Sequence, residues 1–314
     1  MADKLATREA YGQALAELGA KYENLVVLDA DLAAATKTST FKKAFPDRFF
    51  DCGIAEANMI GVAAGLASTG LVPFASSFAM FAAGRAFEQI RNSVGYPHLN
   101  VKIGATHAGI SVGEDGATHQ CNEDIALMRT IPGMVIINPA DAIETKAAVE
   151  AAILHDGPCY LRFGRYAVPT INENSDYKFE LGKGVTLSDG NDVTIVASGL
   201  TVSISLEAAE ILKSQGISAR VINIHTIKPL DEDILVKAAN ETGALLVVEE
   251  HSIIGGLGSA VCEAVCGKCP VPVVRFGMND EFGRSGSAAK LLEMYGFTAE
   301  NFAELAKKAI SMKK

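Results

Sequence analysis

Two histidines and two carboxylates share one stretch of the sequence that glycines interrupt. His107 and His119 flank Glu114 and Asp115, and glycine recurs between residues 104 and 116. Glycine inside a helix or strand costs up to about 1 kcal/mol relative to alanine, so this composition predicts a loop. Imidazoles and carboxylates on a loop suit a polar, hydroxylated or phosphorylated ligand, and the alternative is a surface loop with chance histidines.

A carboxylate also stands at a predicted strand-to-helix junction. Glu56 follows a predicted strand and opens a predicted helix over residues 55–68. Ligands of open α/β sheets bind beyond the carboxyl ends of the strands, where a catalytic carboxylate would be useful. The alternative is that Glu56 only complements the positive end of the helix dipole.

Three phenylalanines, Phe74, Phe78 and Phe81, bracket two serines in the sequence. From the residues alone, apolar packing at helical spacing is favoured over an aromatic slot for a flat heterocycle.

Arg162 and Arg165 follow the last predicted strand of the first half. Their forked donors suit phosphate recognition, and solvent-exposed charge is the alternative.

Two other motifs indicate a ligand site less strongly. The segment 255–259 resembles a dinucleotide-binding turn but lacks the full Gly-x-Gly-x-x-Gly spacing, which disfavours a nucleotide-binding Rossmann enzyme. Cys262, Cys266 and Cys269 have an iron–sulfur spacing. Two of them lie four residues apart on a predicted helix, so buried or incidental thiols are favoured and we assign no metal ligand.

Length and charge narrow the class of protein. The chain has 314 residues, of which 49% are hydrophobic, and a formal net charge of −9. This length suits two domains, and the acidic balance argues against a nucleic-acid partner. Apolar runs fall far short of the roughly 20 residues that span a bilayer, and the N-terminus has no apolar signal core. We therefore expect no membrane partner, a cytoplasmic location, and apolar surface covered by another subunit.

Helical and strand patterns alternate twice along the chain, which predicts an α/β protein of two doubly wound, mainly parallel domains. The first half predicts strands over residues 25–28, 72–75, 101–104, 135–137 and 159–163, and helices over 8–21, 55–68, 78–94, 122–129 and 140–155. The second predicts strands over 193–197, 219–223, 245–249 and 271–275, and helices over 203–214, 231–239, 257–265, 287–294 and 299–312. Residues 167–190, rich in Gly, Asn and Asp, are expected to form a linker with little structure of its own.

Three segments, residues 53–58, 78–84 and 113–120, together resemble the C-terminal half of a transketolase. The resemblance covers nearly the whole chain. It implies a pyrimidine-binding domain over 1–166, a linker over 167–190 and a transketolase C-terminal domain over 191–314. The family's first domain binds the diphosphate of thiamine diphosphate and Mg²⁺ through a Gly-Asp-Gly motif, which this sequence lacks. We therefore expect one subunit of a split transketolase, with the Mg²⁺ ligands on a separate N-terminal subunit.

The resemblance also assigns cofactor contacts. Glu56 matches the catalytic glutamate that hydrogen-bonds N1′ of the cofactor's aminopyrimidine, a role that needs a sheltered carboxyl. Phe78 and Phe81 match aromatics around that ring, which reverses the packing interpretation above. Asp31 matches a residue near the cofactor. The family's Pro-Ser after Asp-Leu is replaced here, and Thr36 is the candidate for the missing hydroxyl.

The same resemblance implies a substrate channel. His107 would bind the donor or acceptor phosphate, Asp115 a sugar hydroxyl, and His119 the reacting carbonyl or its neighbouring hydroxyl. Arg165 and Arg8 would complete the phosphate site.

The implied reaction moves a two-carbon ketol unit between sugar phosphates of the pentose phosphate pathway, in a heterotetramer built on a homodimer of this chain. Alternatives are a 1-deoxyxylulose-5-phosphate synthase, the β-type subunit of a 2-oxo acid dehydrogenase, and a non-catalytic scaffold.

Overall fold

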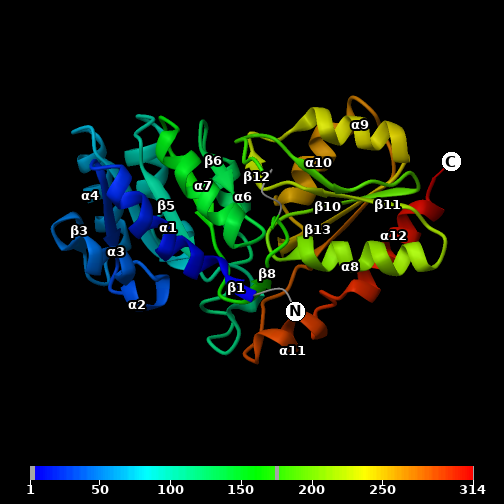
Figure 1. Ribbon diagram of the computed structural model, residues 1–314, viewed down its shortest axis with the longest axis horizontal. Coiled ribbons are helices and arrows are strands. Elements are labelled where there is room, and N and C mark those ends of the chain that lie inside the picture. Colours follow the sequence, from blue (N-terminus) through cyan, green and yellow to red (C-terminus); the bar gives the residue numbers. More distant parts are fainter. Residues whose placement is uncertain (1–3, 174–176, 314) are drawn as a thin grey trace.

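The structure, a computed structural model, describes residues 4–173 and 177–313. Two α/β domains lie side by side along the long axis, and helices flank a mainly parallel sheet in each (Figure 1). This architecture confirms the predicted fold class. Over the described residues, no helix has both the length and the apolar character needed to cross a bilayer.

The sheet of the first domain has seven strands in the order β12-β6-β7-β5-β4-β2-β3. Its parallel strands are β2 (Leu25–Asp29), β3 (Phe49–Asp51), β4 (Val72–Phe78), β5 (Lys102–Thr106), β6 (Val135–Ile137) and β7 (Cys159–Arg162). Helices α1 (Thr7–Lys21) and α7 (Ala142–Leu154) share one apolar core with the sheet, and α4 (Glu56–Ala67) packs into another. The central strands are buried along their whole length, as the continuous apolar runs predict.

The sheet of the second domain has five strands in the order β14-β13-β10-β11-β9. Strands β10 (Val193–Ala197), β11 (Ala219–Asn223), β13 (Leu245–Ser252) and β14 (Val273–Met278) are parallel, and β9 (Val185–Ser188) is an antiparallel edge. Helices α9 (Glu232–Thr242) and α10 (Leu257–Cys266) cover one face. Helices α8 (Thr201–Ser214) and α12 (Ala299–Ser311) cover the other (Figure 1).

The second domain adds one strand to the sheet of the first, which could not be predicted from the sequence. Strand β12 (Thr226–Lys228) leaves the second domain and pairs antiparallel with β6 of the first. Residues 167–190 also differ from the expected unstructured linker, because they contain β8 (Ala167–Pro169), paired with β1 (Lys4–Ala6), and β9. Residues 174–176 of that stretch lie outside the described residues. Strands this short have no periodicity of their own, and they form because a partner strand is already in place.

The predicted helix over residues 78–94 is irregular. Strand β4 extends to Phe78, and two π-helical segments, η2 (Met80–Arg85) and η3 (Ile90–Gly95), flank a short α-helical turn, α5 (Phe87–Gln89). π-helical turns are rare in proteins, and those that occur often lie at functional sites. Here η2 directs Phe81 and Arg85 toward the carboxyl edge of the sheet, where the candidate site lies.

Candidate active site

The carboxyl ends of the parallel strands of the first domain gather the residues that the sequence singled out. Phe78 ends β4, His107 follows β5, and Arg165 follows β7. Glu56 begins α4 shortly after β3. Parallel strands end at one edge of a sheet, so these side chains come from four loops that meet there.

Glu56 is buried, with 1% of its surface exposed, and its partner is a cation. Arg85 Nη1 lies 2.8 Å from Glu56 Oε2, and 52% of the Arg85 side chain is exposed. Met59 and Ile60, on the same helix, are also buried, whereas Ile54 is 78% exposed and does not shelter this carboxyl. Arg85 could not be predicted as the partner of Glu56, because nothing in its sequence spacing links the two residues.

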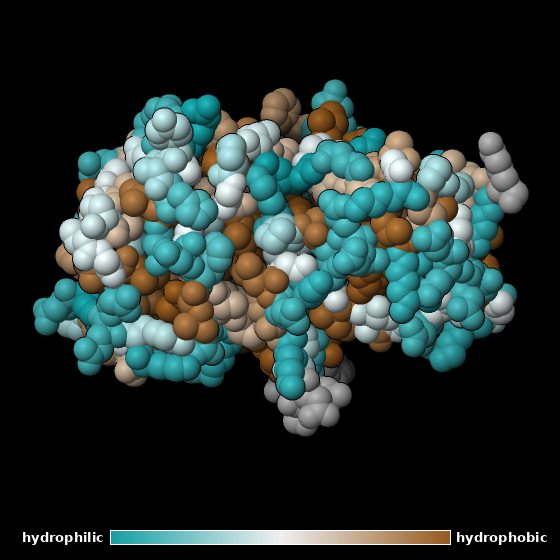
Figure 2. All heavy atoms as spheres, turned by 90° about the horizontal axis from the view of Figure 1, so that it is seen from above, coloured by the Kyte–Doolittle hydropathy of each residue, from teal (hydrophilic) through white to brown (hydrophobic). Residues whose placement is uncertain are grey.

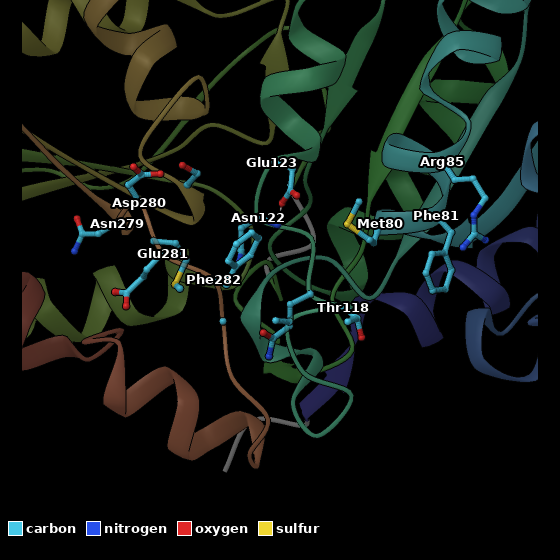
Figure 3. Close-up of a pocket in the computed structure, with 15 residues that line it drawn as sticks. Met80, Phe81, Arg85, Thr118, Asn122, Glu123, Asn279, Asp280, Glu281 and Phe282 are labelled. Atoms are coloured by element: carbon cyan, nitrogen blue, oxygen red, sulfur yellow. Dashed lines mark hydrogen bonds between the residues drawn. The ribbon is translucent and has the colours of Figure 1, made fainter.

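Four rings form a continuous aromatic cluster beside this pair. The centroids of Phe78 and His107 lie 3.7 Å apart and those of Phe78 and Phe81 5.7 Å apart, in stacked arrangements. The His119 ring meets Phe81 edge-on at 5.3 Å. Phe81 and Arg85 line an open cavity of about 600 Å³ that is bordered on the opposite side by Phe282 and its neighbours from the second domain (Figure 3). An aromatic wall facing a cavity is suited to a flat ligand.

His107 is held as a neutral imidazole. Arg8 Nη1 lies 2.8 Å from His107 Nε2, and Thr106 Oγ1 lies 2.9 Å from His107 Nδ1. Burial, reinforced by the charges of Arg8 and Arg165, lowers the pKa of His107 to about 3. A guanidinium can only donate, so Nε2 accepts and Nδ1 carries the hydrogen that is donated to Thr106. The backbone of His107 is also left-handed, with φ of 56°.

Cationic side chains outnumber their counter-ions around His107. Arg8, Arg165 and Lys37 all lower the pKa of His107, which places three cations near one ring. Arg165 Nη1 donates to Glu114 Oε2 at 2.9 Å and also to the Val112 carbonyl. The resulting group of Arg8, Lys37 and Arg165, the cation group, suits an anionic ligand.

Arg162 does not belong to the cation group. It is buried, and its Nε donates to Asp124 Oδ2 at 2.9 Å. Of the two arginines predicted to recognise phosphate, only Arg165 remains a candidate. The sequence does not show whether an arginine is paired with a carboxylate, so only the structure distinguishes Arg162 from Arg165.

The remaining predicted residues occupy the rim. Asp31 is exposed with φ of 61°, and its N–H donates to Asp51 Oδ1 at 3.1 Å. Asp115 is exposed, and His119 Nδ1 lies 2.9 Å from Thr118 Oγ1.

The Thr36 hydroxyl is turned inward. It donates at 2.7 Å to Asp29 Oδ2, whose pKa burial raises to about 6. Thr36 is fully buried and already engaged in this contact, so it does not offer the hydroxyl that the sequence analysis sought from it. Asp29 was not predicted, although it stands two residues before Asp31.

Neither of the two weaker motifs forms a ligand site. The N–H groups of Leu257 and Gly258 donate to the Glu249 carboxylate at 2.6 and 2.8 Å, so the turn at 255–259 is already occupied by a side chain. The thiols are free, and Cys269 Sγ lies 3.0 Å from Asn240 Oδ1. Within residues 4–173 and 177–313, no three histidine, cysteine or acidic side chains are grouped as metal ligands.

Comparison with known proteins identifies the family. Residues 3–170 match the transketolase pyrimidine binding domain, and residues 182–302 match the transketolase C-terminal domain. A Methanocaldococcus jannaschii protein named "Putative transketolase C-terminal section" is 54% identical over 95% of this chain and 94% of its own length. A 6-deoxy-6-sulfo-D-fructose transketolase subunit of Clostridium sp. is 44% identical over 95% of this chain and 92% of its own length.

A solved structure agrees with this assignment. A split-gene transketolase, described as an inactive beta4 tetramer, has a TM-score of 0.92 and 54% identity, and the match covers 99% of this chain and 100% of that one. The pyrimidine-binding domain implies thiamine diphosphate as the cofactor of the family. The chain therefore belongs to the transketolase family, in which it corresponds to the C-terminal half of a split enzyme.

Proposed function

We propose that this chain, together with a separate N-terminal subunit, transfers a two-carbon ketol unit from a ketose phosphate to an aldose phosphate. The observation that carries the proposal is the meeting of Glu56, the aromatic cluster and the cation group at one sheet edge of a transketolase-family chain. A buried acid, a ring slot and an anion site are the three features that such a reaction requires of this half.

The residues present fit the pyrimidine ring of thiamine diphosphate. The bound cofactor supplies a nucleophilic thiazolium carbon for the transfer. Glu56, which is buried, would hold a proton at the ring atom N1′. Phe78 and Phe81 would pack against the ring, with Asp31 nearby. Arg85 occupies Glu56 Oε2 and would withdraw as the cofactor ring takes its place beside this carboxyl.

The cation group would bind the anionic end of the sugar. Arg8 and Arg165 would contact the phosphate, and His107 would orient Arg8 through its Nε2 atom. His119 and Asp115 would contact the carbonyl end and a hydroxyl. A relative named for a sulfonated ketose supports recognition of a terminal anion rather than of phosphate alone.

The diphosphate and Mg²⁺ would be bound by the N-terminal subunit. Large apolar side chains at the surface, among them Ile54 and Phe282 at 78% and 85% exposure, fit contacts with further chains. Figure 2 shows apolar patches between hydrophilic groups on one face of the molecule. The inactive tetramer of the related split-gene protein supports both self-association and the need for a partner. We propose a homodimer of this chain within a heterotetramer, acting in the pentose phosphate pathway, and the free cysteines agree with a cytoplasmic location.

Product analysis tests the proposal. The chain is co-purified with the N-terminal subunit, loaded with thiamine diphosphate and Mg²⁺, and supplied with xylulose 5-phosphate and ribose 5-phosphate. The proposal predicts a seven-carbon ketose phosphate by mass spectrometry. Turnover of pyruvate by the same loaded complex, without that product, would contradict it and indicate a related thiamine diphosphate enzyme.

A further inference from the structure

A buried acid of the second domain reaches the loop that carries the substrate-site candidates of the first. Glu250 lies on β13 with 4% of its surface exposed. Its Oε1 atom accepts a hydrogen bond of 2.7 Å from the backbone N–H of Ser111, a residue 139 positions earlier in the sequence. Ser111 belongs to the short helix η4 (Ile110–Val112), four residues after His107 and four before Asp115.

The backbone around this contact is shaped to admit the carboxyl group. Gly109 has φ of +79°, and a Cβ atom there would lie 2.3 Å from Glu250 Cδ and Oε1. Only glycine allows the loop to approach the carboxyl so closely in this conformation. The Gly109 N–H donates to the Cys121 carbonyl at 2.8 Å, so the two ends of the loop are joined beside Glu250.

The other side of Glu250 is fixed by the first domain as well. Arg162 Nη2 donates to the backbone carbonyl of Glu250 at 2.8 Å, and Arg162 Nε is bound by Asp124. Glu250, Arg162 and Tyr166 border a cavity of about 20 Å³, room for about one water. Glu250 on β13 is therefore held by β7 through its backbone carbonyl and by the loop 107–119 through its carboxyl.

We propose that Glu250 is a positioning residue, through which the second domain fixes the loop 107–119 in the conformation that binds the sugar phosphate. The kinetic test of this inference rests on the proposed function, whereas the hydrogen-exchange test does not depend on it. The second domain would thus contribute to substrate affinity without itself touching the substrate.

The adjacent residue provides a matched control. Glu249 is also buried and also accepts backbone N–H groups, from Leu257 and Gly258, but both donors belong to the second domain. Glu249 and Glu250 are consecutive residues of one strand and point to opposite faces of the sheet. Removing the carboxyl of Glu249 or of Glu250 breaks buried hydrogen bonds in both cases. Of the two, only Glu250 is bonded to the loop 107–119, so a comparison of the two variants isolates that contact.

Hydrogen exchange on the full chain tests the contact without any need for activity. In Glu250→Ala the amides of residues 109–119 should exchange about tenfold faster, because one charge-assisted hydrogen bond is lost. Glu249→Ala should leave those amides unchanged. Equal exchange in Glu250→Ala and wild type, or the same acceleration in Glu249→Ala, would overturn the proposal.

Kinetics on the complex with the N-terminal subunit give the second readout. Glu250→Ala should raise KM for the ketose phosphate about tenfold with little change in kcat, and Glu250→Gln, which keeps an acceptor oxygen, should restore most of the affinity. A fall in kcat at unchanged KM would overturn the positioning role. If the wild-type complex has no ketol-transfer activity while the exchange result holds, the proposed function fails and the contact stands.

A pH profile covers the case in which Glu250→Ala does not fold. Burial raises the pKa of Glu250 to about 7, against the opposing effects of Arg162 and the Ser111 N–H, and Asp124 adds to the rise. His251 and Glu249 flank it on its own strand. Opening of the loop exposes Glu250 to water and returns its pKa toward the ordinary value, so the closed loop binds the proton more tightly. Relative to Glu250→Gln, whose amide does not titrate, exchange of the loop in wild type should therefore slow as pH falls through about 7. Identical profiles for the two proteins would refute the role.

Discussion

Arg85 should compete with the cofactor for Glu56. In the chain alone Arg85 Nη1 lies 2.8 Å from Glu56 Oε2, and Glu56 is buried while Arg85 is half exposed. Breaking a fully buried ion pair costs about 3–5 kcal/mol, and an exposed pair contributes at most about 1 kcal/mol. For a pair with one buried and one half-exposed member we take about 1–2 kcal/mol. The same free energy has to be spent when the cofactor displaces Arg85.

Arg85→Met removes this competition and keeps the apolar stem of the side chain. If the cofactor displaces Arg85 as proposed, removing the contact beforehand should tighten binding of thiamine diphosphate by about 1–2 kcal/mol, or roughly 5- to 30-fold in Kd. The cofactor-free chain should be destabilised by a similar amount. Calorimetric titration of the complex with the N-terminal subunit, at fixed Mg²⁺, measures the first effect, and denaturant unfolding of the free chain measures the second.

Arg91→Met is the matched control, since Arg91 lies in the same irregular segment, is exposed, and contacts its neighbour Asn92. It should leave the cofactor Kd unchanged. Weaker cofactor binding in Arg85→Met would refute the reasoning, because it would mean that Arg85 contacts the cofactor or the partner subunit instead of competing with them.

Two further predictions concern the sugar site. His107 has a folded pKa of about 3, below its ordinary value of 6.5, so the unfolded chain binds this proton first. The stability that His107 contributes is complete above about pH 6.5 and is lost as pH falls toward 3. The free energy of unfolding of His107→Asn, measured by denaturant, should therefore fall less steeply with pH over this range than that of wild type. Equal pH dependence in the two proteins would contradict the assignment. Arg165→Met should raise KM for a phosphorylated ketose by about tenfold or more but leave that for hydroxypyruvate nearly unchanged, whereas equal losses for both donors would exclude a phosphate contact.

The fold could be predicted because its signals are local. Buried parallel strands such as β2 and β10 have continuous apolar runs, and segments with helical patterns alternate with such strands along the chain. Strand β12 could not be predicted, since three residues acquire a strand conformation only by pairing with β6 of the other domain. The π-helical turns at 80–95 were missed for a related reason, because their side chains have ordinary helical spacing.

The site could be predicted only as a set of residue types. Resemblance to a family pointed to Glu56, Phe78 and His107, and the structure brings them to one sheet edge. Their partners were not predicted. Arg85 and Glu250 reach the site from positions 29 residues beyond Glu56 and 139 beyond Ser111, and no sequence spacing encodes such contacts.

The central claim is that Glu56 of this chain completes an active site whose other half lies on a separate subunit. The measurement is formation of the seven-carbon ketose phosphate by the chain alone, by the complex, and by a Glu56→Gln complex with equal cofactor loading. We predict no product from the chain alone, product from the complex, and a loss of about 10²- to 10⁴-fold in Glu56→Gln, as expected for removal of a proton-transferring group. Product from the chain alone, or full activity in the Glu56→Gln complex, would contradict the claim.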